Sequence, residues 1–370
     1  MKNRYLSKQV SVDLSKKMVF LGGPRQVGKT TLARTFLKNK TGYLNWDVSR
    51  DREKILKQEL PVSDLVIFDE IHKYKSWRNY LKGIYDDINR EFKILVTGSA
   101  KLDYYRYSGD SLQGRYYYYR LHPFSVGELG ITSEKDFSSL LKLGGFPEPF
   151  FSQSESEARK WSREYRNRLV REEIVSLEKV TDLGNIELLY LRLPDLVASP
   201  LSINALREDL QVSFRAVANW LNIFERVYSI FRLQPYGSPK IKAVKKEQKH
   251  YHFDWSLVKN EGARFENLVA SHLLKWVHYQ QDIDGRDIEL NYLRDQTGKE
   301  VDFVISENKK LLYLIEVKIS DTEVSPTLKY FKAKFPEAKA YQLTANSKKN
   351  FQTKDGIRVC HALEFLKELV

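Results

Sequence analysis

Three short apolar runs, separated by stretches with helical spacing, dominate the first third of the chain. They cover residues 19–21, 65–68 and 94–96. Uninterrupted apolar strands that alternate with helices are typical of a parallel sheet covered on both faces. The pattern therefore predicts an α/β domain with a parallel sheet over residues 1–145.

The middle of the chain has a different pattern. Turn-forming residues crowd into 144–149, and a charged helical stretch over 155–180 predicts a helical linker or lid region at 146–200. Residues 202–228 then have the spacing of two helices joined by a short turn, with Ser202 and Ser213 at N-cap positions. Alternating runs at 231–235 and 243–253 resemble a strand hairpin, so a winged helix is expected over 201–260.

The last hundred residues mix both kinds of pattern. A helix is expected at 264–279, followed by strands at 288–293, 301–305 and 311–317. We predict a separate α/β domain over 261–370. A chain of 370 residues is long enough for several domains that each bury their own core.

A phosphate-binding motif follows the first apolar run. Residues 23–30 match the pattern G-x-x-x-x-G-K-[ST], in which glycines let backbone N–H groups and a helix N-terminus face phosphate. Lys29 is expected to reach the β- and γ-phosphates of ATP, and Thr30 to place its hydroxyl on Mg²⁺. The residues expected to hold the nucleotide are Gly23, Pro24, Arg25, Gln26, Val27, Gly28, Lys29, Thr30 and Thr31.

Acidic and polar residues end the next two apolar runs. Asp69 and Glu70 follow the run at 65–68, and Thr97 ends the run at 94–96. We predict Asp69 to be the acid on the Mg²⁺ side and Glu70 to orient and polarise the attacking water. Thr97 is expected to sense the γ-phosphate, with Ser99 as the alternative.

Arg115, beside Gly114, has two interpretations. A guanidinium stabilises charge on a transferring phosphoryl group, so Arg115 could be an arginine finger or sensor, in its own subunit or in a neighbour. It could nearly as well be a surface arginine on a strand.

Together these motifs resemble those of one family. They read GGPRQVGKTT at 22–31, FDEIH at 68–72, VTGS at 96–99, GR at 114–115, LHPFSVGE at 121–128 and LGGFPEP at 143–149. The set is similar to prokaryotic AAA-type ATPases that carry a C-terminal domain of unknown function. The resemblance spans nearly the whole chain, and it implies ATP binding, an AAA-like core, a winged helix and a restriction-endonuclease-like C-terminal domain.

Carboxylates and a lysine recur at a fixed spacing near the C-terminus. GKEVDFV at 298–304 and LIEVK at 314–318 are similar to the PD-(D/E)xK nuclease pattern. Glu316 and Lys318 share one face of a strand, and Asp302 and Glu266 could join them. Asp302 and Glu316 could hold Mg²⁺ and Lys318 could stabilise the transition state. Alternating charge on the solvent face of a hairpin gives the same pattern, so we expect the fold rather than cleavage itself.

Net charge points toward anionic partners. Lys and Arg exceed Asp and Glu by 61 − 48 = 13, which suits double-stranded DNA, although a basic proteome or solubility explains the surplus equally well. Arg215 and Asn219 are expected on the outer face of a recognition helix at 213–227. The wing is predicted to contact phosphates through Arg232, Lys240, Lys242, Lys245, Lys246, Lys249 and Lys259. Winged helices also bind proteins or pack as lids.

Three functions fit these patterns. The first is an ATP-driven machine that interacts with DNA, the second a slow nucleotide switch that binds a protein partner, and the third an ATP-gated, metal-dependent nuclease. An AAA-like core is compatible with a homo-oligomer. The basic start of the chain, the single Cys360 and the lack of any run of eighteen apolar residues predict a cytoplasmic protein without a membrane partner.

Overall fold

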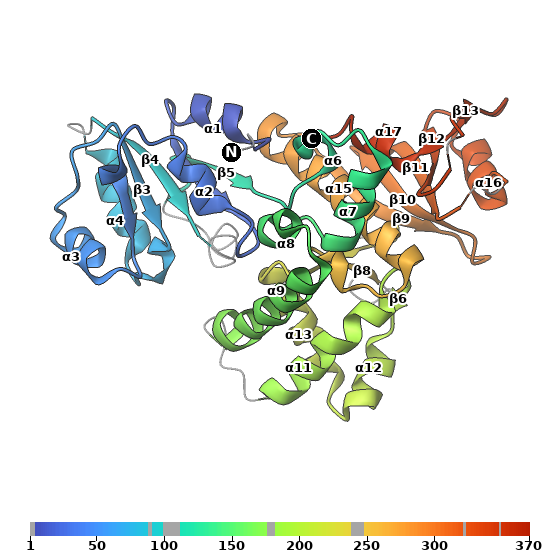
Figure 1. Cartoon of the computed structure of the whole chain (residues 1–370), viewed down its shortest axis with the longest axis horizontal. Helices are drawn as coiled ribbons and strands as arrows, with labels where there is room; N and C mark the ends of the chain where they lie inside the picture. The colour runs from blue at the N-terminus through green and yellow to red at the C-terminus, as the bar shows by residue number, and fades with distance from the viewer. Residues whose placement is uncertain are drawn as a thin grey trace. The chain divides into compact units, whose positions relative to one another are not determined.

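The computed structural model describes residues 4–87, 91–98, 112–175, 182–237, 248–320, 323–347 and 349–370. The chain divides into two compact units (Figure 1). The first comprises Met1–Pro123 with Arg226–Tyr228, and the second comprises Phe124–Glu225 with Ser229–Val370.

The first unit is built on a parallel sheet, as predicted, and this sheet has five strands. Its order is β2-β3-β4-β1-β5. The strands are β1 (Met18–Gly22), β2 (Tyr43–Asn45), β3 (Leu65–Asp69), β4 (Lys93–Thr97) and β5 (Tyr116–Arg120). The three apolar runs became β1, β3 and β4, and the sheet adds two strands that the pattern did not predict. One of these, β5, is formed by the run of four tyrosines and pairs with β1 in parallel.

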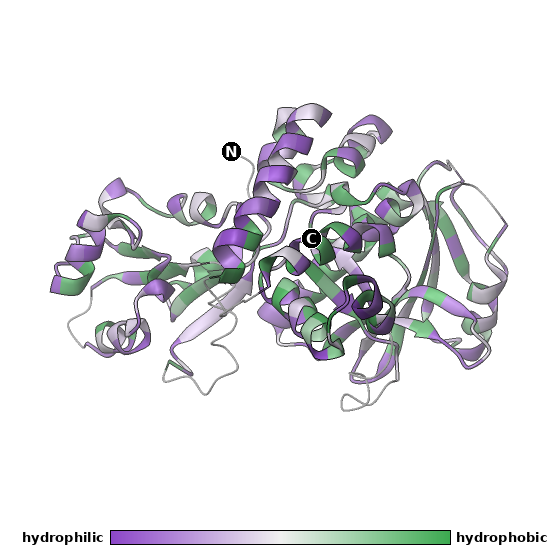
Figure 2. Cartoon of the chain, turned by 90° about the horizontal axis from the view of Figure 1, so that it is seen from below, coloured by the Kyte–Doolittle hydropathy of each residue, from purple (hydrophilic) through white to green (hydrophobic). Residues whose placement is uncertain are grey.

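Helices and short turns connect these strands. They are α1 (Ser7–Asp13), α2 (Lys29–Arg34), η1 (Lys40–Gly42), α3 (Ser49–Lys57), η2 (Ile71–Lys73) and α4 (Trp77–Asp86). A buried cluster that includes Phe20, Phe68, Val96 and Trp77 packs one face of the sheet against α4. Figure 2 shows hydrophobic residues, in green, along these strands. The apolar runs thus form strands because each buries its whole length.

The register of the sheet aligns the carboxyl ends of its strands. Asn45 pairs with Asp69, Asp69 with Thr97, and Leu21 with Thr97. The glycine-rich loop leaves β1 directly after Leu21 and Gly22. Residues distant in sequence therefore meet in one row at this edge of the sheet.

The second unit begins with a helical region. Its elements are α6 (Val126–Leu129), α7 (Glu134–Leu143), α8 (Pro147–Ser152), α9 (Glu155–Arg168), the π-helical turn η4 (Leu169–Ile174), α11 (Leu183–Arg192) and η5 (Leu193–Leu196). The sequence placed a boundary at residue 145, whereas the first compact unit ends at Pro123. Residues after Pro123 pack within the second unit: Lys275 pairs with Glu128, and the Trp255 indole donates to the Leu140 carbonyl at 3.0 Å.

Two helices and a small sheet follow. The helices are α12 (Ile203–Leu210) and α13 (Phe214–Arg226), and the strands are β6 (Pro200–Leu201), β7 (Ile230–Leu233) and β8 (Gln248–His252). The sheet order is β6-β8-β7, with both pairs antiparallel. Both predicted helices and the antiparallel strand pair are confirmed.

The C-terminal part is a six-stranded mixed sheet with the order β13-β14-β12-β11-β10-β9. Its elements are η6 (Trp255–Leu257), α15 (Glu261–Asp284), β9 (Ile288–Arg294), β10 (Glu300–Glu307), β11 (Lys310–Lys318), α16 (Pro326–Lys334), β12 (Lys339–Thr344), β13 (Phe351–Gln352), β14 (Ile357–His361) and α17 (Ala362–Leu366). The predicted helix and its three predicted strands are confirmed as α15, β9, β10 and β11. Across the described residues, no helix combines the length and apolar character needed to cross a membrane.

Candidate functional site

The glycine-rich loop at 23–28 has a backbone that requires its glycines. Gly23 has a φ of 133°, and a Cβ on it would lie 2.3 Å from the carbonyl oxygen of Leu121. Gly28 has a φ of 98° and stands at the N-cap of α2. Side chains at these positions would be strained, since only glycine adopts such conformations at little cost. The loop between them turns sharply and leads into the helix N-terminus.

Lys29 folds back over this loop. It is the first residue of α2 and is buried, with 8% of its surface exposed. Its ammonium donates to the carbonyl oxygens of Gly23 at 2.9 Å and Pro24 at 2.6 Å. The Lys29 ammonium therefore lies against the loop, where it could contact a bound phosphate. Thr31, by contrast, is exposed on the outer side of the helix.

Asp69, at the end of β3, accepts hydrogen bonds from three hydroxyls. Thr30 donates to Oδ2 at 2.9 Å, Tyr43 to Oδ2 at 2.5 Å, and Thr97 to Oδ1 at 2.5 Å. Burial, and then the Asp69 carboxylate, raise the pKa of the Tyr43 hydroxyl, so Tyr43 remains a donor at neutral pH. All the donors that the described residues offer to Asp69 are uncharged.

This arrangement fits a magnesium ion. Mg²⁺ prefers carboxylate and hydroxyl oxygens together with substrate phosphates. Asp69 and Thr30 present such oxygens side by side, at the mouth of a loop that is suited to phosphate. The predicted metal pair is thus brought together from β3 and α2. Thr97 holds the Asp69 carboxylate here, and its sensing role stays a prediction; Ser99 lies outside the described residues.

Glu70 follows Asp69 in an unusual backbone conformation. Its φ is 59°, in the left-handed region that non-glycine residues rarely adopt and that often marks functional sites. Its N–H donates to the Thr97 carbonyl at 2.9 Å. Its carboxylate lies 3.3 Å from the Lys73 ammonium and 3.5 Å from Nε2 of His72. Glu70 is partly exposed at the same edge of the sheet as Asp69, and it lies next to the Lys73 ammonium and the His72 imidazole.

Arg115 lies at the opposite edge of the sheet. Tyr116, the next residue, pairs with Met18 at the start of β1, whereas the glycine-rich loop leaves the end of that strand. Four residue steps of a strand separate these points by about 13 Å. The guanidinium forms an ion pair with Asp86, at 2.8 Å from Nε and 2.9 Å from Nη2. Arg115 is therefore remote from the nucleotide loop of its own chain.

Two residues of the nucleotide region were not anticipated from the sequence. Tyr43 is one, and Arg4 is the other: its guanidinium is buried and donates to the carbonyl oxygen of Val27 at 2.7 Å and also to that of His122. Arg4 thus ties the segment before α1 to the glycine-rich loop. Neither belongs to a motif, so only the tertiary contacts identify them.

The C-terminal site residues do come together. Asp302 on β10 and Glu316 on β11 each lie one residue beyond the paired residues Phe303 and Ile315, and the Asp302 carboxylate accepts from the Val317 N–H at 2.8 Å. Lys318 lies 2.8 Å from Glu316. Glu266 reaches the same region from α15 and accepts from the Tyr251 hydroxyl at 2.8 Å. We refer to Glu266, Glu300, Asp302 and Glu316 as the carboxylate cluster.

Burial changes the protonation of this cluster. It is the largest cause that raises the pKa of Glu266 to about 8 and of Glu316 to about 7, and the neighbouring Asp302 charge adds to both shifts. Burial likewise raises the pKa of Asp302. Burial thus makes Glu266 and Glu316 release their protons at a higher pH than exposed carboxyl groups do.

An ammonium occupies the middle of the cluster. Lys249 from β8 is 1% exposed, and its Nζ lies 2.6 Å from Glu300, 3.5 Å from Glu266 and 3.9 Å from Asp302. A divalent metal needs several oxygen ligands at 2.0–2.6 Å with no other cation among them. In the part of the chain that the structure describes, no three His, Cys, Asp or Glu side chains are arranged to hold a metal ion. The metal expected at Asp302 and Glu316 does not fit this arrangement.

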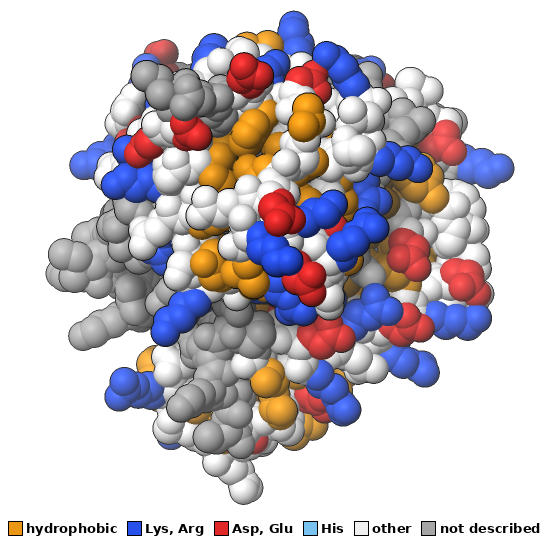
Figure 3. Space-filling model, turned by 90° about the vertical axis from the view of Figure 1, so that its left-hand side faces the viewer, with side chains coloured by type: hydrophobic (Ala, Val, Ile, Leu, Met, Phe, Trp, Pro, Cys, Tyr) orange, Lys and Arg blue, Asp and Glu red, His pale blue; other side chains and the backbone are white. Residues whose placement is uncertain are grey.

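Two residues of the predicted basic wing form ion pairs within the protein, so they do not face a DNA phosphate. Lys249 is buried in the carboxylate cluster, and Arg232 pairs with Glu225. Lys259 is exposed, while Lys240, Lys242, Lys245 and Lys246 lie outside the described residues. Arg215 and Asn219 are exposed on α13, as expected. Figure 3 shows Lys and Arg interspersed with Asp and Glu over one face of the molecule, so the described charges on that face do not gather into a patch of one sign.

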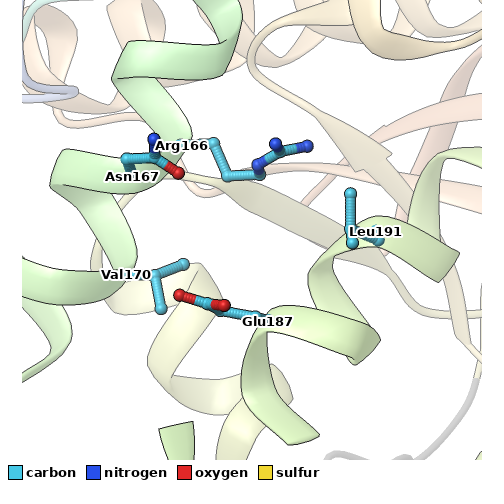
Figure 4. Close-up of a pocket in the computed structure, with 5 residues that line it drawn as sticks. All are labelled: Arg166, Asn167, Val170, Glu187 and Leu191. Atoms are coloured by element: carbon cyan, nitrogen blue, oxygen red, sulfur yellow. The ribbon is translucent and has the colours of Figure 1, made fainter. Parts of the chain in front are cut away.

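A small hollow lies in the helical region of the second unit (Figure 4). It has a volume of about 70 Å³ and is lined by Arg166, Asn167, Val170, Glu187 and Leu191. Sites for drug-sized ligands usually measure 300 Å³ or more, so this hollow suits a few water molecules rather than a nucleotide.

Comparisons with known proteins divide the chain into three parts. Residues 15–130 match an AAA domain, residues 134–262 a domain of unknown function (DUF8612), and residues 261–365 another domain of unknown function (DUF4143). These matches support the predicted order of an ATPase-type domain followed by domains of undefined role.

Three similar proteins are described as uncharacterised. The chain is 24% identical over 352 residues to an uncharacterised protein of Methanocaldococcus jannaschii, covering 84% of this chain and 77% of that protein. It is 26% identical over 165 residues to uncharacterised proteins of Mycobacterium bovis and Mycobacterium tuberculosis, covering 43% of this chain but only 36% of each of those proteins.

Among solved structures, one match is a DNA polymerase III gamma subunit-related protein of Thermotoga maritima. The match covers 60% of this chain and 97% of that protein's chain. The identity is 12% and the TM-score 0.28. A STAND signal-transduction ATPase of Pyrococcus horikoshii matches 77% of this chain and 49% of its own, at 14% identity and a TM-score of 0.23. Scores this low carry no argument, and the sequence matches alone identify an AAA domain at residues 15–130, followed by two domains of unknown function.

Proposed function

We propose that the first unit binds ATP with Mg²⁺ and hydrolyses it. The observation that carries this proposal is the hydrogen bond of 2.9 Å between Thr30, at the start of α2, and Asp69, at the end of β3. It joins the two residues expected to hold Mg²⁺, beside a buried lysine and a glycine-rich loop. The match of residues 15–130 to an AAA domain supports the same function.

Each residue has a distinct role in this proposal. Lys29 would neutralise charge on the β- and γ-phosphates, and the N–H groups of the loop would orient them. Asp69 and Thr30 would hold Mg²⁺, which supplies further neutralisation of the phosphate oxygens. Glu70 would accept a proton from the water that attacks the γ-phosphorus, while the bond from that phosphorus to the bridging oxygen breaks and ADP leaves.

The test compares steady-state ATP turnover, with and without Mg²⁺, in wild-type protein and two variants. We expect Lys29→Ala to lose nucleotide binding, since it removes the cation that meets the phosphates. Glu70→Gln should retain ATP but turn it over roughly 100-fold more slowly or worse, because only the proton acceptor is lost. Nucleotide binding is measured separately by isothermal titration calorimetry.

Glu53→Gln is the matched control. Glu53 is exposed on α3, and its substitution makes the same chemical change away from the proposed site. Turnover in this variant should equal that of wild type. A wild-type protein that binds no Mg·ATP, or a Glu70→Gln variant as active as wild type, would contradict the assigned roles.

A second part of the proposal is that turnover is coupled to double-stranded DNA through α13. We interpret α12, α13 and the β6-β8-β7 sheet as a winged helix, and the C-terminal mixed sheet as a nuclease-like core. The observation that favours DNA is the exposure of Arg215 and Asn219 on the outer side of α13, where a recognition helix would read a groove. The surplus of positive charge adds a general attraction to phosphate.

DNA binding is measured by fluorescence anisotropy with labelled duplex at several salt concentrations. Arg215→Ala should weaken binding and, if it contacts a phosphate, lower the slope of log K against log salt by about one. Arg163→Ala removes an exposed arginine from α9 and serves as the control. If wild type has no affinity for duplex and DNA leaves its ATP turnover unchanged, the slow switch with a protein partner becomes the better explanation.

A further inference from the structure

In the second unit, a buried lysine on the three-stranded sheet contacts residues of the C-terminal domain. Lys249 lies on β8, which pairs with β6 and β7, but its ammonium is surrounded by carboxylates from α15 and β10. Lysine is rarely buried to this extent unless it is paired. Here 1% of the residue is exposed, so almost no water remains to solvate the charge.

Strand geometry explains how Lys249 reaches these partners. Lys249 and Tyr251 are two residues apart on β8, so their side chains leave the strand on the same side. Both meet Glu266: the Tyr251 hydroxyl at 2.8 Å and the Lys249 ammonium at 3.5 Å from Oε1. Two successive side chains of one face therefore enter the cluster together.

Distances rank the partners of the ammonium. Glu300 is in hydrogen-bonding contact at 2.6 Å, while Glu266 and Asp302 follow at 3.5 and 3.9 Å. Burial works to lower the pKa of Lys249, but the three carboxylates outweigh it and hold that pKa above its usual range. The lysine is thus charged at any physiological pH.

A further acceptor in the cluster has no partner. Glu316 is 4% exposed, and its Oε2 makes no hydrogen bond with any described residue, although Oε1 meets Lys318 at 2.8 Å. A buried carboxylate oxygen without a donor is costly. The cluster therefore contains more carboxyl oxygens than its two ammonium groups contact.

We propose that Lys249 is the resident cation of the carboxylate cluster: its ammonium takes the place of a divalent metal and keeps such a metal out. The C-terminal domain then works without a metal, and the same contact fastens β8 to the C-terminal sheet. Metal-dependent cleavage of nucleic acid is not expected from this domain while Lys249 is in place. Without the ammonium, Glu266, Glu300 and Asp302 each keep an oxygen within 4 Å of the point that it occupied, and these oxygens would have to move closer together to reach the distances that Mg²⁺ or Mn²⁺ requires.

The experiment measures Mn²⁺ binding to the full chain by electron paramagnetic resonance, without nucleotide. All proteins carry Asp69→Asn, so that the P-loop acid does not contribute. With Lys249 intact we expect no Mn²⁺ bound at the cluster up to about 1 mM. Lys249→Met, which keeps the apolar stem, should bind one Mn²⁺ at least ten-fold more tightly, and Asp302→Asn in that variant should abolish this binding.

Lys275→Met provides the matched control. Lys275 is also 1% exposed, and its ammonium forms an ion pair with Glu128 and donates to the Ser125 hydroxyl at 2.9 Å. This variant should lose stability without gaining a metal site. A metal site in both lysine variants would mean that loosened packing, and not the carboxylate cluster, binds the ion.

A thermal melt decides the case in which Lys249→Met folds poorly. Ligand binding to the native state raises the melting temperature, so Mn²⁺ should stabilise Lys249→Met and leave the protein with Lys249 unchanged. Mn²⁺ binding to the protein with Lys249 that disappears in Asp302→Asn overturns the proposal. So does a Lys249→Met protein that Mn²⁺ neither binds nor stabilises.

Discussion

The two acidic sites of this protein hold their carboxylates in opposite ways. Asp69 accepts from the hydroxyls of Thr30, Tyr43 and Thr97, so its bonds are satisfied while its negative charge is kept. The carboxylate cluster is instead filled by the ammonium groups of Lys249 and Lys318. Neutral donors leave a carboxylate able to bind an external cation, whereas an internal ammonium takes that cation's place.

This contrast bears on which site does chemistry. A carboxylate oriented by hydroxyls keeps its negative charge, as the proposed Mg²⁺ and ATP site requires. A carboxylate paired with a buried lysine is part of the internal architecture, because separating the two leaves a charge in a place with little water. The residue types of the two sites are similar, and their partners distinguish them.

The largest expected effect comes from neutralising the acid at the first site. Asp69→Asn keeps the size of the side chain but removes the charge that would hold Mg²⁺. We expect turnover of ATP to fall by roughly 100-fold or more, a loss of about 3 kcal/mol in transition-state stabilisation. Measurement is by steady-state phosphate release at saturating Mg²⁺.

Asp64→Asn tests whether position matters for this effect. Asp64 lies at the other end of β3, half exposed and paired with Lys38. Turnover should stay close to wild type. An equal loss in both variants would show that the carboxylates act through stability rather than through the metal.

The next effect concerns the other buried lysine of the second unit. Lys275 pairs with Glu128, and both side chains are only 2% exposed. Lys275→Met removes the ammonium that forms an ion pair with the buried Glu128, so the free energy of unfolding should fall by roughly 3–5 kcal/mol. Urea denaturation followed by circular dichroism measures the change.

The exposed pair of Lys367 and Glu364 is the matched control. These side chains lie 2.6 Å apart but are 43% and 41% exposed. Lys367→Met should change the free energy of unfolding by less than about 1 kcal/mol, since water replaces the partner. Removal of both charges, in Glu128→Gln with Lys275→Met, should cost less than the sum of the single changes.

A smaller effect on the free energy of unfolding is expected when the pH is lowered. His272 on α15 is buried with one nitrogen at 2.8 Å from the Leu268 carbonyl and the other accepting from the Val126 N–H at 3.0 Å. Burial is the largest cause that lowers the pKa of His272 from 6.5 to about 4, and the nearby Lys275 lowers it further against the opposite effect of Glu128. A protonated ring could no longer accept from Val126.

The sign of the pH dependence follows from these values. Between pH 6.5 and 4 the unfolded chain binds a proton at His272 that the folded chain does not, so the free energy of unfolding falls as the pH falls. The loss for this group is on the order of 3 kcal/mol. In His272→Gln, the free energy of unfolding from urea denaturation should depend less steeply on pH over this range than in wild type. Above pH 7 the plots of this free energy against pH for the two proteins should run parallel. Equal slopes of the two plots below pH 6 would refute the assignment.

The smallest effect is expected from Arg115. Because it pairs with Asp86 at the far edge of the sheet, Arg115→Ala should leave ATP turnover in dilute protein within about twofold of wild type. If Arg115 acts on a neighbouring subunit, ATP turnover per chain of the wild-type protein should rise with protein concentration. The Arg115→Ala variant should not show this rise. Arg52→Ala, at an exposed position on α3, is the control.

The sequence alone determined the parts of this protein that depend on local pattern. Three apolar runs predicted β1, β3 and β4, because a strand buried along its whole length must be apolar throughout. The glycine-rich loop, Lys29 and the acid pair were identified from spacing that phosphate and Mg²⁺ impose. The C-terminal strands were also predicted from short strand-like runs, and β10 and β11 each contain four consecutive buried residues.

Features that depend on contact between distant segments came only from the tertiary structure. The run of four tyrosines has no apolar pattern, and it becomes β5 by pairing with β1. The sequence left open whether Arg115 is an arginine finger. The strand register places it at the end of the sheet opposite the glycine-rich loop. Arg4 and Tyr43 belong to no motif, yet both contact the nucleotide region.

Lys249 shows the physical reason most clearly. Along the chain it is one of several bases in a predicted wing, and its neighbours suggest a residue exposed to solvent. Folding brings it against Glu300, 51 positions later by number, and against Glu266 on a helix. Local pattern sets which elements form, but the charge that a buried group meets is set by the segments packed around it, and those are chosen by the fold as a whole.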